Sequence, residues 1–141
     1  MAWAGNKFKS RQDALSRAKA VHVCLDCRHT QTKIYKLCPM CNSKNRQYFM
    51  SEGEFHRGMT LLTLQAAGTV SEVKFQPPFE LLVNGTRLGK YIADFSYKDK
   101  DGKFIVEDYK GSRDHIEPLA NWKMSHLEAQ YGIKVKITDA K

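Results

Sequence analysis

The stretch KYIADFSYKDKDGKFIVEDYKGS, Lys90–Ser112, decides how the main part of this chain folds. Within it, Tyr91–Tyr97 and Lys103–Tyr109 carry the β-branched and aromatic residues that favour strands. The charged and glycine-containing segment Lys98–Gly102 separates them and has the composition of a turn. The pattern predicts a β-hairpin.

The turn also predicts the register of this hairpin. If the loop has three residues and ends at Gly102 in the left-handed conformation, Asp99 pairs with Lys103. Counting inward by pairs then places Asp94 directly opposite Asp108. Like charges that face each other across a ladder are destabilising, so a fold keeps such a pair where a positive group lies beside it. A divalent cation would meet this need.

Alternation of side chains along each strand assigns the hairpin residues to two faces. One face is expected to carry Ile92, Asp94, Ser96, Val106, Asp108 and Lys110, and the other Tyr91, Ala93, Phe95, Ile105, Glu107 and Tyr109. Lys110 should therefore stand beside Asp108, with Glu107 pointing away. Two carboxylates and an ammonium group suit a site that holds a metal ion and a water against a phosphodiester. An ordinary charged surface hairpin is the alternative, but apolar residues on both faces favour a covered, central position.

The residues of this hairpin resemble a known family. Asp94 followed by Asp108-Tyr109-Lys110 resembles the split acid and D-x-K motif of the PD-(D/E)xK nucleases, with Ala93 where that family usually has proline. The segments YIADF and VEDYKG, preceded by FMSEGE and AAGTVSEVKFQPPFEL, are similar to a group of small phage-encoded members regarded as resembling Holliday junction resolvases. The resemblance covers about Phe49–Thr138. It implies an α/β fold in residues 49–141, a restriction-endonuclease-like core of order αβββαβ with a mixed sheet flanked by helices.

The resemblance also implies a function, a Mg²⁺- or Mn²⁺-dependent endonuclease that cuts branched DNA during phage DNA recombination or processing. Asp94 and Asp108 would hold one or two ions, with the backbone carbonyl of Tyr109 as a further ligand. Lys110 would orient or help to deprotonate the attacking water, and Glu54 would complete the catalytic set. DNA and a second copy of the chain are the expected partners. The alternative is a nucleic-acid-binding or assembly factor whose nuclease-like domain is inactive, against which the intact acids and lysine argue.

The first third of the chain contains two Cys-x-x-Cys motifs. They are formed by Cys24, Cys27, Cys38 and Cys41, and the ten residues RHTQTKIYKL separate them. This spacing is typical of a zinc ribbon, here residues 21–48, in which four thiolates surround one structural zinc ion. Disulfides and an iron–sulfur cluster are the alternatives. A chain without a signal-peptide core is expected to keep its thiols reduced, which argues against disulfides.

The charge of the chain is concentrated at its N-terminal end. The net charge is +8, and residues 1–48 contain ten Lys and Arg side chains against two Asp. A basic module attached to a neutral one suggests that the first holds a polyanion on which the second acts. The residues expected to contact DNA are Lys33, Lys36, Lys44, Arg46, Arg113 and Lys123. Residues 1–20 are expected to form a basic arm or short helix, for which a merely solubilising role is the alternative.

Two helices are expected on either side of the hairpin. Ser51 and Glu54 match a capping box that opens a helix ending near Gly68, so Glu54 has a structural explanation beside its catalytic one. Pro118 and Gly132 bound the second helix.

Strands are expected at residues 70–76, 79–83 and 133–137, with a break at Pro77-Pro78. No apolar run approaches the ~20 residues of a membrane span, and MAWAGNKFKSRQ has no signal-peptide core. We expect a protein without membrane association in the cytoplasm of an infected or lysogenic bacterial host.

Overall fold

The computed structural model describes residues 20–110 and 116–139. The chain forms two compact units, of which one ends at Phe55 and the other begins at His56. The predicted arm, apart from Ala20, lies outside the described residues. The polar loop at residues 111–115, with Arg113, also lies outside them.

The first unit is built on a small antiparallel sheet. Its strands are β1 (Val21–Cys24), β2 (Thr30–Gln31) and β3 (Arg46–Phe49), in the order β2-β1-β3. Val21, Val23 and Phe49 are buried, and the Phe49 ring meets Phe55 edge-on at 6.0 Å between centroids. So few apolar side chains make a marginal core, because a unit of this size buries little surface on folding.

The second unit is a mixed α/β structure. Its elements are α2 (Glu52–Ala66, which begins in the first unit), β4 (Ser71–Phe75), β5 (Pro78–Val83), β6 (Thr86–Ile92), β7 (Phe95–Lys98), β8 (Phe104–Tyr109), α3 (Pro118–Tyr131) and β9 (Lys136–Thr138). Strands β4, β7, β8 and β9 form a four-stranded sheet in that order, and β5 pairs with β6. Pairing is parallel between β8 and β9 and antiparallel elsewhere. The prediction of an α/β fold with a mixed sheet is confirmed.

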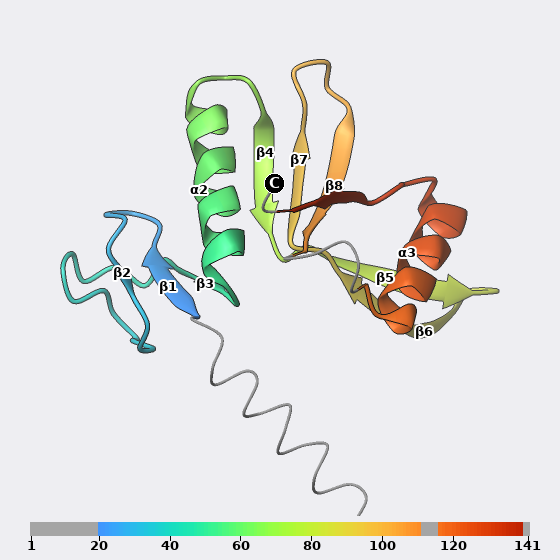
Figure 1. The fold of residues 1–141 in the computed structure, drawn as a ribbon, viewed down its shortest axis with the longest axis horizontal. Helices are drawn as coiled ribbons and strands as arrows, with labels where there is room; N and C mark the ends of the chain where they lie inside the picture. The colour runs from blue at the N-terminus through green and yellow to red at the C-terminus, as the bar shows by residue number, and fades with distance from the viewer. Residues whose placement is uncertain (1–19, 111–115, 140–141) are drawn as a thin grey trace, which may run out of the picture. The chain divides into compact units, whose positions relative to one another are not determined.

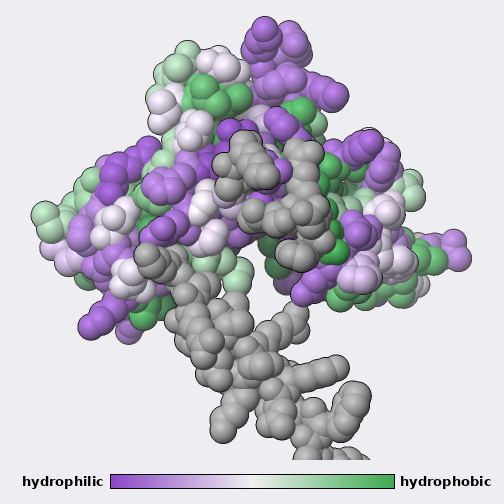
Figure 2. All heavy atoms as spheres, viewed as in Figure 1, coloured by the Kyte–Doolittle hydropathy of each residue, from purple (hydrophilic) through white to green (hydrophobic). Residues whose placement is uncertain are grey.

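The β7–β8 hairpin has the predicted turn and register, and its strands are the two inner strands of the sheet. Asp99 donates its backbone N–H to the Lys103 carbonyl at 2.9 Å, and Gly102 is left-handed with φ +81°. The ladder continues inward to Phe95 opposite Glu107. The next pair in this register is Asp94 and Asp108. Figure 2 shows hydrophilic residues gathered over the tip of the hairpin.

The predicted strand Tyr91–Tyr97 is in fact two strands. β6 ends at Ile92 and β7 begins at Phe95, so Ala93 and Asp94 lie between them. The opposing chain is interrupted at the same level, between β4 and β5. The predicted break at Pro77-Pro78 accounts for this interruption, because proline has no N–H to donate to a ladder.

The interruption is a bend in one long hairpin. Gln76 donates its backbone N–H to the Asp94 carbonyl at 2.9 Å, and Ala93 donates to the Pro77 carbonyl at 3.2 Å. These bonds have the same register as the Phe75–Phe95 pair on one side and the Pro78–Ile92 pair on the other. Segments β4–β5 and β6–β7 are therefore two continuous, bent strands. If each bent strand is counted once, the described part of the unit runs helix, three strands, helix and strand.

The bend changes which face the residues before it occupy. Tyr91 and Ala93 pack in the core with Val106 and Leu127, and Val106 shares its face of β8 with Asp108. The assignment of Tyr91 and Ala93 to the opposite face, made from strict alternation, is wrong. The cause is the break in alternation at Ala93 and Asp94, which lie outside both strands.

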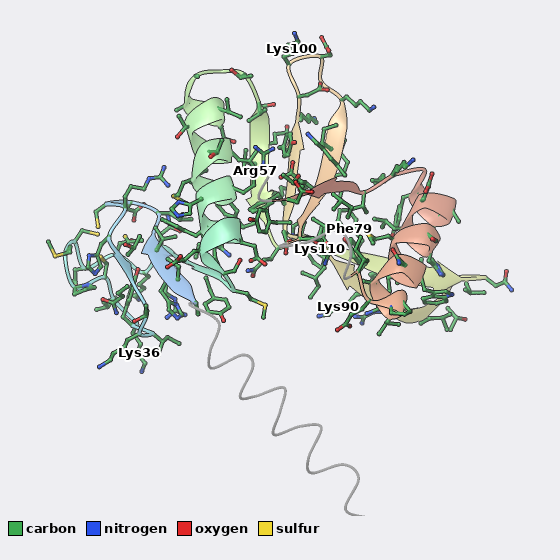
Figure 3. The ribbon with its side chains drawn as sticks, in the orientation of Figure 1. Lys36, Arg57, Phe79, Lys90, Lys100 and Lys110 are labelled. Carbon is green, nitrogen blue, oxygen red and sulfur yellow. The ribbon has the colours of Figure 1, made fainter. Side chains whose placement is uncertain are left out.

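The two helices cover opposite faces of β8. Arg57 of α2 binds Glu107 through two hydrogen bonds, Nε to Oε2 at 2.7 Å and Nη2 to Oε1 at 2.8 Å. The preceding residue, Val106, points the other way and packs in the cluster that contains Leu127 of α3. Figure 3 shows Arg57 extending from α2 toward the strands. Neither helix of the described residues is of a length and apolarity that would allow it to cross a membrane.

Helix α3 lies along β5, as Figure 1 shows, and satisfies part of its backbone. His126 Nε2 lies 3.0 Å from the Leu82 carbonyl, and the Leu82 N–H donates to Gln130 at 2.8 Å. Tyr131 donates its hydroxyl to the Glu80 carbonyl at 2.7 Å. The helix runs from Pro118 to Tyr131, and Gly132 is left-handed with φ +68°. The predicted start and end of this helix are confirmed.

The Arg57–Glu107 pair should dominate the stability of the second unit. Glu107 is fully buried, and Tyr97 donates its hydroxyl to it at 3.1 Å. Burial acts to raise the pKa of Glu107, but the hydrogen bonds and charge of Arg57 outweigh it and lower the pKa. The pair therefore stabilises the fold at neutral pH, and this contribution is lost as the pH falls below the ordinary glutamate value through the lowered pKa.

We predict that Arg57→Ala lowers the free energy of unfolding by about 3–5 kcal/mol at pH 7, because it removes the two charged hydrogen bonds that hold a buried carboxylate. Arg87→Ala is the matched control, since Arg87 and Glu80 are both exposed and 3.8 Å apart. Its effect should stay within about 1 kcal/mol. Urea denaturation followed by circular dichroism measures both. If both variants lose the same free energy of unfolding, the buried pair stabilises the fold no more than the exposed pair does.

Candidate metal sites

The four cysteines form one cluster in the first unit. Their sulfur atoms all lie within 4.8 Å of one another, and the Cys24–Cys41 and Cys27–Cys38 pairs are each 3.5 Å apart. A disulfide requires about 2.05 Å, and all four thiols are free. Tetrahedral zinc with Zn–S bonds of about 2.3 Å places its sulfurs ~3.8 Å apart. The cluster could therefore hold a metal ion, as predicted, and the disulfide alternative is not realised.

The two Cys-x-x-Cys turns have the same backbone geometry. Arg28 donates its N–H to the Cys24 carbonyl at 2.9 Å, and Asn42 donates to the Cys38 carbonyl at 2.8 Å. Both donors are left-handed, with φ +66° and +63°. Asp26 joins the turns by accepting a hydrogen bond from Asn45 at 3.0 Å. The repeated turn holds two pairs of sulfurs toward a common centre.

Electrostatics within this cluster favour a bound cation. The backbone hydrogen bond at Cys27 lowers the pKa of Cys24 to about 6. A backbone hydrogen bond at Ser43 acts to lower the pKa of Cys41, but burial and the neighbouring sulfurs outweigh it and raise that pKa to about 12. One thiolate therefore opposes ionisation of the others. A divalent cation removes this opposition, because coordinated thiols are deprotonated.

The second candidate site lies at the base of the β7–β8 hairpin. Asp94 Oδ2 accepts the backbone N–H of Tyr109 at 2.7 Å, which holds its carboxylate against the end of β8. Asp108 is buried, and its Oδ2 lies 2.8 Å from Lys110 Nζ. The Lys110 N–H donates to the Thr138 carbonyl at 2.8 Å, which fixes this residue beside β9. Figure 3 shows Lys110 at the end of the hairpin opposite to Lys100. The structure thus places Lys110 beside Asp108 and holds Asp94 against Tyr109, the residue between Asp108 and Lys110 in sequence.

Tyr91 also lies at this site, although strict alternation along the strand predicted that its side chain would be on the face opposite to Asp108. Its side chain is 5% exposed, and among the described residues its hydroxyl has no hydrogen-bond partner. Burial raises the pKa of Tyr91 well above its usual value, and the negative charges of Asp108 and Asp94 add to this effect. The hydroxyl therefore lies near both carboxylates. The Pro77-Pro78 pair in the opposing chain segment was the sequence signal for the bend, and the bend puts Tyr91 on the same face as Asp108.

The donor set fits a hard divalent cation. Among the described residues of the second unit, no His, Cys or third acid joins Asp94 and Asp108 in a cluster of ligand atoms. Mg²⁺ is commonly bound by one or two carboxylates, with water and substrate oxygens completing its shell. Such an ion, held by Asp94 and the buried Asp108, would offset the negative charge of both carboxylates.

Glu54 caps helix α2. Ser51 Oγ accepts the Glu54 N–H at 3.2 Å, and Glu54 Oε2 accepts the Met50 N–H at 3.2 Å. The predicted capping box is confirmed, and the bond back to the chain before the helix goes to Met50. The metal-binding role that the resemblance implies for Glu54 stays a prediction.

The lysines expected to contact DNA in the first unit are exposed, namely Lys33, Lys36 and Lys44. Arg46 differs from them. Its guanidinium lies over the Tyr35 ring, 5.7 Å from the centroid, and donates to the Tyr35 carbonyl. Arg46 thus stabilises the connection between the two Cys-x-x-Cys turns. Both residues, with Lys36 and Lys44, line a cavity of about 800 Å³. In the second unit, Lys123 is half-buried on α3.

Comparison with known proteins adds no assignment. The chain matches no protein-family model and no curated protein.

The capping role of Glu54 predicts a modest effect on stability alone. Glu54→Gln and the matched variant Ser51→Ala should each lower the free energy of unfolding, the latter by about 1 kcal/mol. Neither should change the affinity of the zinc-loaded protein for Mn²⁺, measured by calorimetry. A loss of Mn²⁺ affinity in Glu54→Gln that Ser51→Ala does not share would instead make Glu54 a metal ligand.

Proposed function

We propose that this chain is a divalent-cation-dependent DNA endonuclease of the PD-(D/E)xK type that carries a structural zinc ribbon. The observation behind the proposal is that, at the base of a central hairpin, Asp94 accepts the N–H of Tyr109, the residue next to Asp108, and Lys110 Nζ lies 2.8 Å from Asp108. The mixed sheet and the order of helix, three strands, helix and strand support it.

The residues of the hairpin would divide the chemistry among them. Asp94, Asp108 and the Tyr109 carbonyl would hold Mg²⁺, which supplies Lewis-acid activation and lowers the pKa of a bound water. The ammonium group of Lys110, fixed by Asp108, would orient the attacking water and offset negative charge that develops on the phosphate. The Tyr109 N–H keeps the Asp94 carboxylate in place.

The ribbon would anchor the substrate. Four cysteines close the coordination sphere of zinc, so that ion would be structural and would take no part in cleavage. Lys33, Lys36 and Lys44 would contact phosphates, which are the main source of nucleic-acid affinity. A preference for branched DNA, a homodimer and a role in phage DNA recombination come from the family resemblance.

The first prediction of this proposal concerns the two acids. Asp94→Asn and Asp108→Asn should each reduce Mg²⁺-dependent nicking of a supercoiled plasmid, and cutting of a four-way junction, to background. DNA binding should be kept or improved, because each variant removes a negative charge that faces phosphate. Asp101→Asn, at the exposed tip of the same hairpin, is the control and should cut normally.

Normal turnover in either active-site variant would contradict this assignment. If the unmodified chain binds DNA but cuts neither substrate, the alternative of an inactive nucleic-acid-binding or assembly factor is correct.

The second prediction concerns zinc. Metal analysis of the purified protein should find about one zinc per chain, retained under chelation that removes Mg²⁺. Cys38→Ser should lose this zinc and unfold the first unit, while the cooperative unfolding of the second unit remains. Protein without zinc and with four reactive thiols would rule out the ribbon.

The third prediction concerns salt dependence. Replacing Lys33, Lys36 and Lys44 by Gln should flatten the plot of log affinity for DNA against log salt by about 0.9 per lost phosphate contact. Cleavage at low ionic strength should persist, since the hairpin is unchanged. A variant with Lys100, Lys103 and Lys134 replaced removes equal charge and serves as the control. Equal slopes for both variants would show that the ribbon has no special part in binding.

A further inference from the structure

A buried hydroxyl without a partner stands beside the two acids. Tyr91 is 5% exposed, and its hydroxyl makes no hydrogen bond to the described residues. Buried polar atoms are paired in nearly all folded proteins, because an unpaired one forfeits its hydrogen bonds to water. An unpaired buried hydroxyl is therefore unusual, and its position beside a candidate metal site indicates a role at that site.

Packing of the Tyr91 ring in the hydrophobic core fixes the position of its hydroxyl. Tyr91 is the penultimate residue of β6, just before the bend, and it belongs to the buried cluster that contains Leu81, Val106 and Leu127. The bend at Ala93 places the ring on the face of the sheet that carries Asp108. A ring held by core contacts on a strand is rigidly positioned, so its hydroxyl is preorganised toward the carboxylates.

The chemistry of the phenol determines its role. A tyrosine hydroxyl has an ordinary pKa of about 10, so at neutral pH the group is protonated and can donate a hydrogen bond. The carboxylates of Asp108 and Asp94 lie close enough to act on this hydroxyl, and Asp108 is the candidate acceptor. Asp108 already accepts from Lys110 at 2.8 Å, but a carboxylate has about four lone-pair positions and can accept further bonds.

We propose that Tyr91 is a positioning residue of the metal site, whose hydroxyl donates a hydrogen bond to the Asp108 carboxylate when that carboxylate holds a cation. Asp108 is then oriented from two sides, by the Lys110 ammonium and by the Tyr91 hydroxyl. Groups that hydrogen-bond to ligating carboxylates commonly change metal affinity by 10- to 100-fold. This inference rests on the proposed cation site and does not depend on the nature of the substrate.

The test is cation binding by Tyr91→Phe, which keeps the ring and removes the hydroxyl. Titration of zinc-loaded protein with Mn²⁺, followed by calorimetry and by electron paramagnetic resonance, should show a dissociation constant raised about 10-fold or more. Without Mn²⁺, the midpoint of urea unfolding should be unchanged or higher, because the variant removes an unpaired buried group. Weaker cation binding without loss of stability separates a positioning role from a structural one.

Tyr97→Phe is the matched control. It removes another buried tyrosine hydroxyl, which donates to Glu107 at 3.1 Å on the opposite face of β8. This variant should unfold at lower urea and bind Mn²⁺ as the unmodified protein does. If Tyr97→Phe weakens Mn²⁺ binding as much as Tyr91→Phe, the effect is a general loss of packing and the proposal is wrong.

Two further outcomes separate this proposal from the proposed function. If Tyr91→Phe binds Mn²⁺ normally while Asp108→Asn does not, Tyr91 has no positioning role and the cation site stands. If the zinc-loaded, unmodified protein binds no Mn²⁺, both the cation site and the role of Tyr91 are excluded.

Discussion

The register of the β7–β8 hairpin is the constraint on which the candidate site depends. The turn at Gly102 sets the register, which pairs Phe95 with Glu107 and makes Asp94 and Asp108 the next residues of the two chain segments. One backbone N–H and one ammonium group offset part of their charge. Under the proposed function, a cation bound by these two acids would offset their negative charge.

The two neighbouring acids of β8 have different surroundings. Glu107 is fully buried, accepts two hydrogen bonds from Arg57 and one from Tyr97, and its pKa is lowered. This carboxylate is satisfied within the protein and fastens α2 to the sheet. Asp108, on the opposite face, has Lys110 on one oxygen and the unpaired Tyr91 hydroxyl nearby. The strand thus carries one acid suited to stability and one suited to binding.

Local sequence signals predicted the hairpin, the four-cysteine cluster and the cap at Ser51 and Glu54, because each depends on residues that lie within one short segment, at most 17 positions apart. The face of Tyr91 was predicted wrongly, because the bend that determines it arises across the ladder, where the opposing strand is interrupted at Gln76 and Pro77. The Arg57–Glu107 pair could not be anticipated, because fifty residues separate its partners. The Arg57 and Glu107 side chains come into contact only after α2 packs on the sheet.

The central claim is that Asp94 and Asp108 together bind a divalent cation. Crystals of the zinc-loaded protein, soaked in Mn²⁺, test it through anomalous scattering measured at the manganese and zinc absorption edges. We expect a manganese peak in contact with both carboxylates and a separate zinc peak among the four cysteines. Zinc at the cysteines with no manganese between Asp94 and Asp108 at saturating Mn²⁺ would contradict the claim.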